Sequence, residues 1–248
     1  MLLEHDTKTP DLETSSQQYR ARFSGAVGEW MLEKQKSAVR DAIAQLSCRP
    51  QTVLEVGGCH GQLLGLYHEL NLKPTIQGSH IAALTNLQAY AQSLSVKPEF
   101  ATEVSNLWEL PFEDQSFDLV IAVRLLAHVT AWEDLLKELS RVARQAVIID
   151  YPSLSALNRL TPILFNYKRK IEGNTRPYFS YTGHELRSSL RLQGMTVSSV
   201  HKQFAFPMGL HRLLKQPRIS SFMENVCACL GITKIIGSPV VLSCRRKA

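Results

Sequence analysis

The sequence predicts an α/β fold in which helices cover both faces of a largely parallel sheet. Between residues 50 and 152, short apolar segments of strand length alternate with segments of helical periodicity, as in repeated βα units. The strongest strand segment, 117–123, is apolar apart from Asp118, which is typical of a central strand covered on both faces. Glycines also cluster directly after the first strand segment, where ligands bind in doubly wound sheets.

The first helical layer precedes this sheet. Between residues 17 and 46, Trp30, Val39 and Ile43 are among the residues that supply apolar helical spacing, and Pro50 ends the layer. The following segments predict strands at 52–56, 74–78, 99–102 and 117–123, with helices at 62–69 and 82–93 between them.

After the central strand, residues 132–144 place their leucines and valine on one helical face, so they predict an amphipathic helix. Residues 146–149 predict a fifth strand. The remaining elements are a helix at 184–193, a strand at 195–206, a helix at 220–230 and a strand at 238–244.

The polar, aperiodic amino terminus predicts a flexible tail. This tail is residues 1–16, and residues 17–248 predict a single domain. Within the domain we expect a helical lid at 17–49, a ligand-binding core at 50–152, and two substrate-side insertions at 153–184 and 207–237.

Bulk composition narrows the class of protein only in part. A length of 248 residues and a hydrophobic content of 44% fit one α/β domain with a sizeable core. The formal net charge of +6 is compatible with an anionic substrate, a membrane surface or nucleic acid, and selects none of them. No aromatic-interleaved basic patch indicates nucleic-acid binding.

Cysteine usage and hydropathy suggest where the protein works. The five cysteines have neither disulfide-framework nor zinc-site spacing, so we expect reduced thiols and no metal. No apolar run is long enough to span a membrane, and no basic segment followed by an apolar core marks a secretory signal. We therefore expect a cytoplasmic protein.

The stretch Val-Leu-Glu-Val-Gly-Gly-Cys-His-Gly at 53–61 carries the most information. It predicts a buried strand that enters a tight glycine turn, where a ligand can approach the backbone. The carboxylate of Glu55 would repel a pyrophosphate and favour a ligand with cationic groups.

Two further segments combine with this loop: Gln-Gly-Ser-His-Ile at 77–81 and Leu-Pro-Phe-Glu-Asp-Gln-Ser-Phe-Asp-Leu-Val-Ile at 110–121. Together the three resemble the class I S-adenosylmethionine-dependent methyltransferases, in particular the group of quinone-biosynthesis and small-molecule enzymes. The resemblance covers residues 50–152. It implies a Rossmann-like, doubly wound, seven-stranded sheet whose last strand is antiparallel and inserted beside its neighbour.

The resemblance also implies that S-adenosyl-L-methionine is the cofactor and that the loop after the first strand holds its methionine portion. The implied residues of this loop are Glu55, Gly57, Gly58, Cys59 and Gly61. His60, within the loop, is expected to shape it.

The sequence departs from the family pattern at three places. Cys59 takes the place of the middle glycine. Ser79 or His80 aligns with the acid that grips the ribose hydroxyls, and a histidine cannot make a bidentate carboxylate clasp. Leu107 and Trp108 align with the polar residue that meets the adenine amine, although Trp108 could instead stack on the adenine ring.

Residues after the central strand are candidates for chemistry. His128 is a candidate general base for a hydroxyl nucleophile; the alternative is a histidine satisfied by the backbone at a helix start. Arg124, grouped with the cofactor-side residues, could orient an anionic substrate or pair with a carboxylate of the fold. Asp118 is expected to fix the loop before the fourth strand.

Three more residues are candidates for the substrate side. Tyr19 could close over the methionine end of the cofactor or belong to an ordinary packing helix. Arg176, near Lys168–Lys170, suggests an anionic patch or a solvated charged face. His211 could line the acceptor pocket or belong to the core.

The predicted function is transfer of a methyl group to an oxygen or carbon of a small-molecule acceptor, within EC 2.1.1. Arg124-Leu125-Leu126-Ala127 stands where an Asn-Pro-Pro-Tyr-type tetrapeptide would be expected. This difference disfavours methylation of amino groups on nucleic-acid bases or glutamine. Alternatives are a non-catalytic binding protein of the same fold, an RNA methyltransferase, and an NAD-dependent oxidoreductase. The last requires glycine where Cys59 and Gln62 stand.

Overall fold

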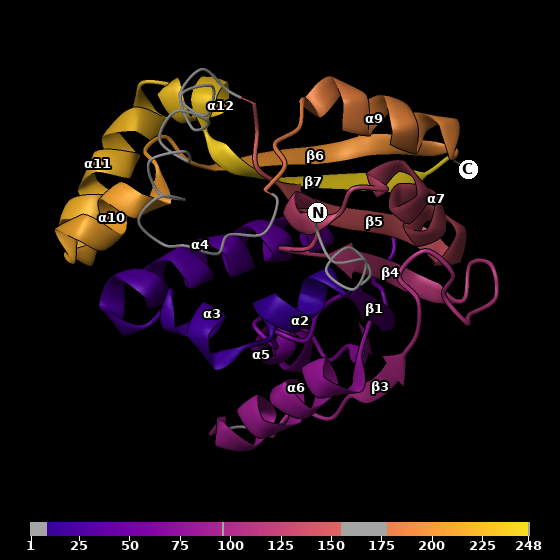
Figure 1. Cartoon of the computed structure of the whole chain (residues 1–248). Coiled ribbons are helices and arrows are strands. Elements are labelled where there is room, and N and C mark those ends of the chain that lie inside the picture. The colour runs from indigo at the N-terminus through magenta and orange to yellow at the C-terminus, as the bar shows by residue number, and fades with distance from the viewer. Residues whose placement is uncertain (1–8, 96, 155–177, 248) are drawn as a thin grey trace, which may run out of the picture.

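The computed structural model describes residues 9–95, 97–154 and 178–247. They form one seven-stranded sheet in the order β3-β2-β1-β4-β5-β7-β6, with helices on both faces (Figure 1). The strands are β1 (Thr52–Val56), β2 (Lys73–Gly78), β3 (Ala101–Val104), β4 (Phe117–Ala122), β5 (Ala143–Tyr151), β6 (Met195–Phe204) and β7 (Ser238–Arg246).

Strand β1 lies between β2 and β4 and pairs in parallel with both. On the other side of β4, strand β7 is inserted between β5 and β6 and runs antiparallel to each. The sheet is therefore mostly parallel with a single reversed strand, as the sequence comparison with the methyltransferase family implied.

Alternate residues of the central strand serve two separate cores. Leu119 and Ile121 of β4 pack with apolar side chains of α4 (Gly25–Ala44), α5 (Leu64–Glu69) and α6 (Ile81–Ser93). Val120 and Ala122 pack with α7 (Trp132–Val142) and α9 (Gly183–Leu192) on the opposite face. The period-two burial of β4 explains why its sequence is apolar throughout.

The amino-terminal segment is ordered where the sequence analysis expected a tail. Pro10–Thr14 forms helix α2, and Gln17–Ala21 forms α3. Asp11 is completely buried and Thr14 nearly so. The predicted flexible tail 1–16 is therefore wrong for residues 9–16; residues 1–8 lie outside the described part of the chain.

The segment between β6 and β7 adds an outer layer. It contains α10 (Met208–Leu214), α11 (Pro217–Cys229) and α12 (Ile232–Ile236), the yellow helices of Figure 1. The sequence predicted only the middle one. Of the other predicted insertion, 153–184, residues 155–177 lie outside the described residues.

Asp118 lies at the amino edge of the sheet, away from the glycine loop. Its Oδ2 accepts hydrogen bonds from the backbone N–H groups of Gln51 and Thr52, 2.9 and 3.1 Å away. Burial opposes ionisation of this carboxyl, but these bonds prevail and lower its pKa. Asp118 therefore fixes the entry to β1, and not the loop before β4 that the sequence analysis expected.

Within the described ranges, no helix is long and apolar enough to cross a bilayer. A search of the same residues finds no group of three or more His, Cys, Asp or Glu side chains arranged to hold a metal ion.

Candidate functional site

The turn after β1 depends on glycine at two positions. Gly57 and Gly61 have φ angles of +67° and +73°, in the left-handed region that L side chains avoid. A Cβ at Gly57 would also lie 2.8 Å from Cδ1 of Leu125. The Gly57 N–H donates to the carbonyl of Gln77 at 3.0 Å, which ties the turn to the end of β2. A side chain at Gly57 or Gly61 would therefore force the turn to move.

Glu55 lies underneath the turn and is completely buried. Tyr67 donates a hydrogen bond to its Oε2 at 2.9 Å. A Cβ at Gly58 would lie 2.4 Å from Cγ of Glu55, so the Gly58 backbone closes directly over this side chain. Burial raises the pKa of Glu55 to about 8 despite the Tyr67 hydrogen bond. This pKa favours the protonated form of the carboxyl at neutral pH.

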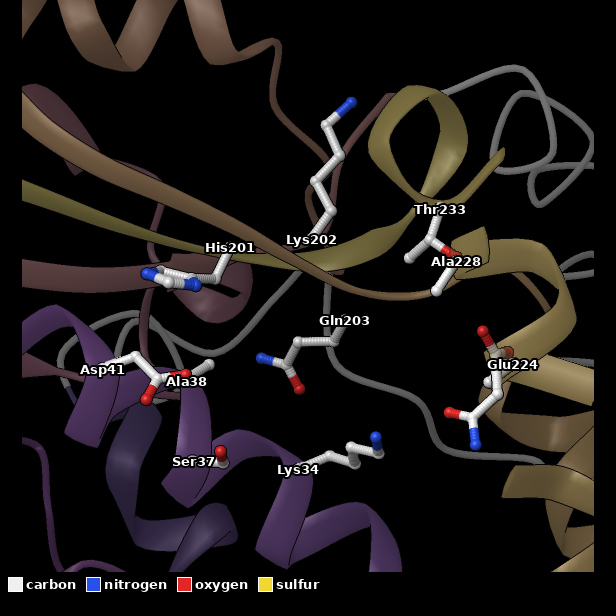
Figure 2. A pocket seen from close by; sticks show the side chains of 11 residues that line it. Lys34, Ser37, Ala38, Asp41, His201, Lys202, Gln203, Glu224, Ala228 and Thr233 are labelled. Carbon is white, nitrogen blue, oxygen red and sulfur yellow. The ribbon is translucent and has the colours of Figure 1, made fainter. Parts of the chain in front are cut away.

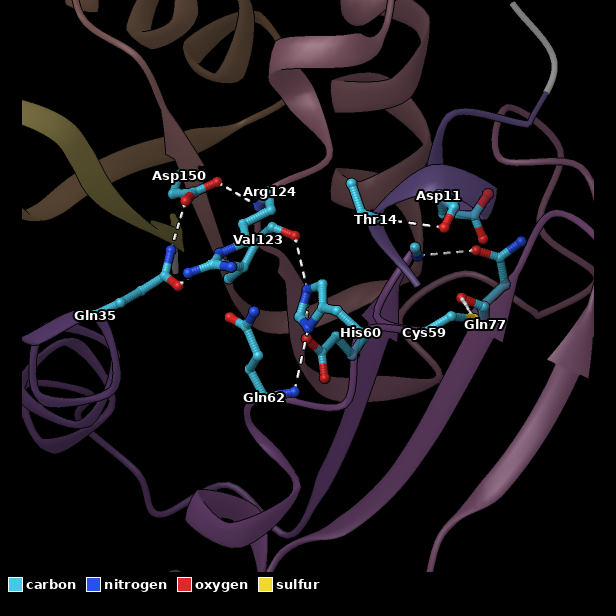
Figure 3. Close-up of polar contacts among 12 residues, drawn as sticks. Asp11, Thr14, Gln35, Cys59, His60, Gln62, Gln77, Val123, Arg124 and Asp150 are labelled. Carbon is cyan, nitrogen blue, oxygen red and sulfur yellow. Dashed lines mark hydrogen bonds and ion pairs between the residues drawn. The ribbon is translucent and has the colours of Figure 1, made fainter. Parts of the chain in front are cut away.

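His60 links the turn to the end of β4. Its Nε2 donates to the carbonyl of Val123 at 3.1 Å, and its Nδ1 accepts from the N–H of Gln62 at 3.2 Å (Figure 3). Burial, with the charge of Arg124, lowers the pKa of His60 to about 3. The ring is therefore neutral and holds the loop in shape.

The side chain of Cys59 is accommodated at the glycine position by lying against the end of β2. Its side chain is completely buried, and its Sγ contacts the carbonyl oxygen of Gln77 at 3.9 Å. The space exists because residue 78 is glycine: a Cβ there would lie 2.7 Å from the Sγ of Cys59. The thiol is thus accommodated against β2.

The end of β2 acquires a carboxylate from elsewhere in the chain. Asp11 of α2 accepts a hydrogen bond from the N–H of Ser79 at 2.8 Å and a second from the Ser79 hydroxyl. His80 is exposed and uses its Nδ1 to accept from the N–H of Ala82, which caps α6. Asp11 therefore places a carboxylate next to the end of β2.

Sequence analysis missed Asp11, although a local signal existed. Thr-Pro-Asp at 9–11 places proline at the first helical position and an acid in the first turn, a typical helix start. The contact with Ser79, 68 residues away, carries no local signal.

The two residues expected on the adenine side differ in position. Leu107 is completely buried, and its side chain packs in the apolar core. Trp108 is partly buried, and its Nε1 donates to the carbonyl of Ala131 at 2.9 Å. Asn106, in the same loop, is exposed, and its Oδ1 accepts a hydrogen bond from the N–H of Trp108.

Arg124 follows β4 in a strained backbone conformation, with φ +59°. Asp150 of β5 accepts from the Arg124 N–H at 2.6 Å, and Gln35 of α4 bridges the two residues (Figure 3). The Gln35 bonds are 2.7 Å to Oδ2 of Asp150 and 3.1 Å from Nε of Arg124. Burial raises the pKa of Asp150 to about 6, partly offset by its bonds to Arg124. Three elements thus hold one arginine at the carboxyl edge.

The guanidinium group of Arg124 lies over Phe23, with its carbon 3.8 Å from the ring centre. Arg212 of α10 approaches the same ring at 5.3 Å, and Tyr19 lies 6.0 Å from Arg124. Among the described residues, Nη1 of Arg124 and Nε of Arg212 are buried without a hydrogen-bond partner. Two cationic groups with unused donors therefore converge around one aromatic ring.

His128 lies in a short 3-10 turn, Leu126–His128, just beyond Arg124. Its ring meets that of Tyr178 edge to face, with centres 5.8 Å apart. The nearby hydroxyl of Tyr181 donates to the carbonyls of Leu126 and Val129, which stabilises this turn. His128 thus remains on the same edge as the glycine loop.

His211 is completely buried, and its Nε2 lies 2.9 Å from Oε1 of Glu224. Its ring packs against Trp30, Phe204 and Phe206. The expectation that His211 faces an acceptor is therefore corrected to a supporting role beside Arg212. Arg176 lies outside the described residues.

A separate cavity of about 240 Å³ opens between α4, β6 and α11 (Figure 2). Its lining includes the polar side chains of His201, Gln203 and Asn225. None of the predicted site residues lines it.

Residues 54–149 match the family model described as a methyltransferase domain. This part of the chain is therefore similar to a methyltransferase domain. The match covers the glycine loop, the β2 end and the β4 edge, the three places where the structure assembles the polar groups described above.

Solved structures share the fold across most of the chain. Magnesium protoporphyrin IX methyltransferase from Synechocystis PCC 6803, with bound S-adenosylhomocysteine, is 12% identical, with a TM-score of 0.61 over 92% of this chain and 93% of that one. Geranyl diphosphate methyltransferase, in complex with geranyl diphosphate and sinefungin, is 12% identical, with a TM-score of 0.59 over 85% of this chain and 77% of that one. The cyclase SpnF is 14% identical, with a TM-score of 0.56 over 86% and 81%. At these identities the likeness establishes the fold alone.

Proposed function

We propose that this methyltransferase domain uses S-adenosylmethionine to methylate an oxygen or carbon of a small, anionic acceptor. The observation that carries the proposal is the carboxyl edge of β1, β2 and β4. There a turn closed to side chains at Gly57 and Gly58 lies beside the Asp11–Ser79 pair and the unpaired donors of Arg124. This combination provides a backbone surface, a hydroxyl acceptor and an anion site along one edge.

The residues at this edge fit the proposed cofactor. The Sγ of Cys59 lies against Gly78, so this side chain replaces a glycine without displacing the turn. Asp11 supplies the acidic acceptor that two ribose hydroxyls require, in place of an acid on β2. When bound, S-adenosylmethionine supplies the methyl group and the sulfide leaving group.

Arg124 and Arg212 support an anionic acceptor. A guanidinium group can form paired hydrogen bonds with a carboxylate or phosphate, and partial burial strengthens such bonds. Burial lowers the pKa of both arginines, which expresses the cost of holding these cations away from water. A bound anion would offset that cost, and the two arginines would orient the acceptor.

The protein's own contribution to methyl transfer is then alignment and exclusion of water. We propose that Tyr19, on α3, covers the site and that His128 receives the proton of a hydroxyl acceptor. A carbon acceptor that is already nucleophilic would not need this proton transfer.

Calorimetry and a transfer assay test the proposal together. We expect S-adenosylhomocysteine to bind and NAD not to bind. We then expect methyl label from S-adenosylmethionine to enter some members of a panel of hydroxylated carboxylates and phosphates, and not their neutral esters. Tight NAD binding with no S-adenosylhomocysteine binding would overturn the proposal.

The same data test the alternative of a binding protein without transferase activity. The cyclase SpnF is an example of a similar fold with a different activity in its name. Binding of S-adenosylhomocysteine without label transfer to any anionic acceptor would favour that alternative. Loss of transfer in His128→Ala with unchanged cofactor binding would support catalysis with a general base.

A further inference from the structure

Helix α11 has its apolar side turned outward. Its exposed stripe follows intervals of three or four residues and therefore lies along one side of the helix. This stripe consists of Ile219, Phe222, Val226 and Leu230. The opposite, buried stripe consists of Ser220, Glu224 and Cys227. An ordinary surface helix shows the reverse distribution.

Glu224 fixes this orientation. Its carboxylate accepts hydrogen bonds from the backbone N–H groups of Ala205 and Phe206, at 2.8 and 3.0 Å. It also contacts Nε2 of His211 at 2.9 Å. Rolling α11 to bury its apolar stripe would break all three contacts and expose a paired, buried carboxylate.

The inner side of α11 also faces a polar space. Asn225 and Ala228 line the cavity between α11 and α4 that Figure 2 shows, together with His201 and Gln203 of β6. Nε2 of His201 and Nε2 of Gln203 have no hydrogen-bond partner among the described residues, which is the chemistry of a water-filled cleft. The inner side of α11 therefore carries polar groups towards this space, and its apolar stripe faces outward.

The surroundings of the stripe are cationic. Lys215, Arg218 and Lys234 are exposed around α11, and Glu224, which is buried, is the one acidic residue of positions 201–248. Further apolar side chains are exposed on the adjoining helices, Leu213 on α10 and Ile235 on α12. The outer layer thus combines exposed apolar groups with an uncompensated positive charge.

We propose that α10–α12 dock the protein onto a membrane surface that contains anionic lipids, with α11 lying in the plane of the interface. Apolar side chains on one side, combined with lysine and arginine, are the properties of helices that bind at this depth. A second copy of the chain fits less well. A two-fold interface there would bring like charges together, and this surface has no exposed acid to pair with them.

Vesicle flotation of the whole protein tests the proposal. We expect binding to vesicles of phosphatidylcholine with phosphatidylglycerol, much weaker binding to pure phosphatidylcholine, and weakening by salt. Phe222→Asp should lower the partition coefficient about tenfold or more, because it removes a large buried apolar group from the lipid. Leu192→Asp is the matched control, since Leu192 on α9 is 84% exposed against 70% for Phe222.

A charge pair of variants tests the electrostatic part. Arg218→Glu should weaken binding to anionic vesicles by roughly fivefold or more, whereas Arg191→Glu on α9 should not. Equal binding of Phe222→Asp and the unmodified protein, or no binding to either vesicle, would overturn the proposal. So would a dimer in lipid-free solution that Phe222→Asp dissociates, because the stripe would then be a contact between copies.

Discussion

Glu55 and Arg124, two ionisable groups at the carboxyl edge of the sheet, are held in opposite ways. Glu55, beneath the turn after β1, is sealed by Gly58 and Tyr67 and is mainly neutral. Arg124, after β4, keeps its charge and an unused donor beside Phe23. The β1–β2 half of this edge therefore consists of tightly packed backbone, and the β4 half presents a positive charge. Under the proposed function, we infer that the β1–β2 half binds the cofactor and the β4 half binds the acceptor.

The largest effect should come from Gly57→Val. The left-handed φ of +67° and the 2.8 Å approach of Leu125 leave no room for a β-branched side chain. We expect S-adenosylhomocysteine affinity, measured by calorimetry, to fall more than about 100-fold. Gly65→Ala is the control, since a Cβ at Gly65 meets no atom within 4 Å. A folded Gly57→Val protein with normal affinity would remove the turn from the binding surface.

Asp11→Asn should come next. The amide keeps the size of the side chain but loses the second acceptor oxygen and the charge at Ser79. We expect S-adenosylhomocysteine affinity to fall roughly 10- to 100-fold, which corresponds to one charge-assisted hydrogen-bond pair. Glu13→Gln on the same helix, whose partner Arg22 is exposed, should leave affinity unchanged. If both variants behave alike, α2 acts by packing and not through Asp11.

Arg124→Gln sharpens the assignment of the β4 half. We expect the affinity for pyrophosphate or citrate, measured by calorimetry, to fall about tenfold or more because a guanidinium donor pair is lost. Affinity for S-adenosylhomocysteine should change less than about twofold. An equal fall for S-adenosylhomocysteine would move Arg124 to the cofactor half, with the cofactor's own carboxylate as its anion.

Glu55→Gln tests whether the β1 half is neutral. In the folded protein the pKa of Glu55 is raised to about 8, so the folded state holds a proton that the unfolded chain releases above its ordinary value near 4.5. Stability from this group is therefore present below pH 4.5 and is lost as pH rises towards 8, by at most about 1.4 kcal/mol per pH unit.

The glutamine variant lacks this proton, so its stability relative to the unmodified protein should increase between pH 4.5 and 8. Urea unfolding at several pH values measures the difference. Asp150 remains in both proteins and does not enter the comparison. A constant difference across this range would mean that Glu55 is charged in the folded state.

The smallest effect should come from Cys59→Gly, which restores the family glycine. Cys59 is not among the residues with positive φ, so the backbone does not require glycine there. Loss of the buried Sγ should cost about 1–2 kcal/mol of unfolding free energy, measured by urea unfolding. Cofactor affinity should stay within about twofold, since the thiol faces Gly78. A marked gain in affinity would show that Cys59 narrows the site.

Local patterns in the sequence predicted most of the sheet. The β1 segment 52–56 agrees with the structure, and a run of apolar residues sufficed to place β4. The turn at Gly57 followed from glycines after a strand. The position of the reversed strand came from the resemblance to the family, because strand order depends on pairings that periodicity does not encode.

The polar contacts of the site could not be predicted because they join distant segments. Gln35 and Asp150 are 115 residues apart, and Gln35 and Arg124 are 89 apart. The neutral state of Glu55 depends on burial by Gly58 and Tyr67, which a sequence does not display. The burial of Leu107 could not be foreseen for the same reason, because an alignment position does not give the direction of a side chain.

The Asp11–Ser79 pair has a kinetic consequence. Its carboxylate belongs to a helix of five residues and not to the sheet, so under the proposed function the ribose-side acceptor would move with that helix. Exchange of spent for fresh cofactor would then require α2 to detach, at a rate set by two hydrogen bonds and the packing of one helical turn. In that case, the residence time of the product would respond to the amino-terminal segment while the acceptor side stays unchanged.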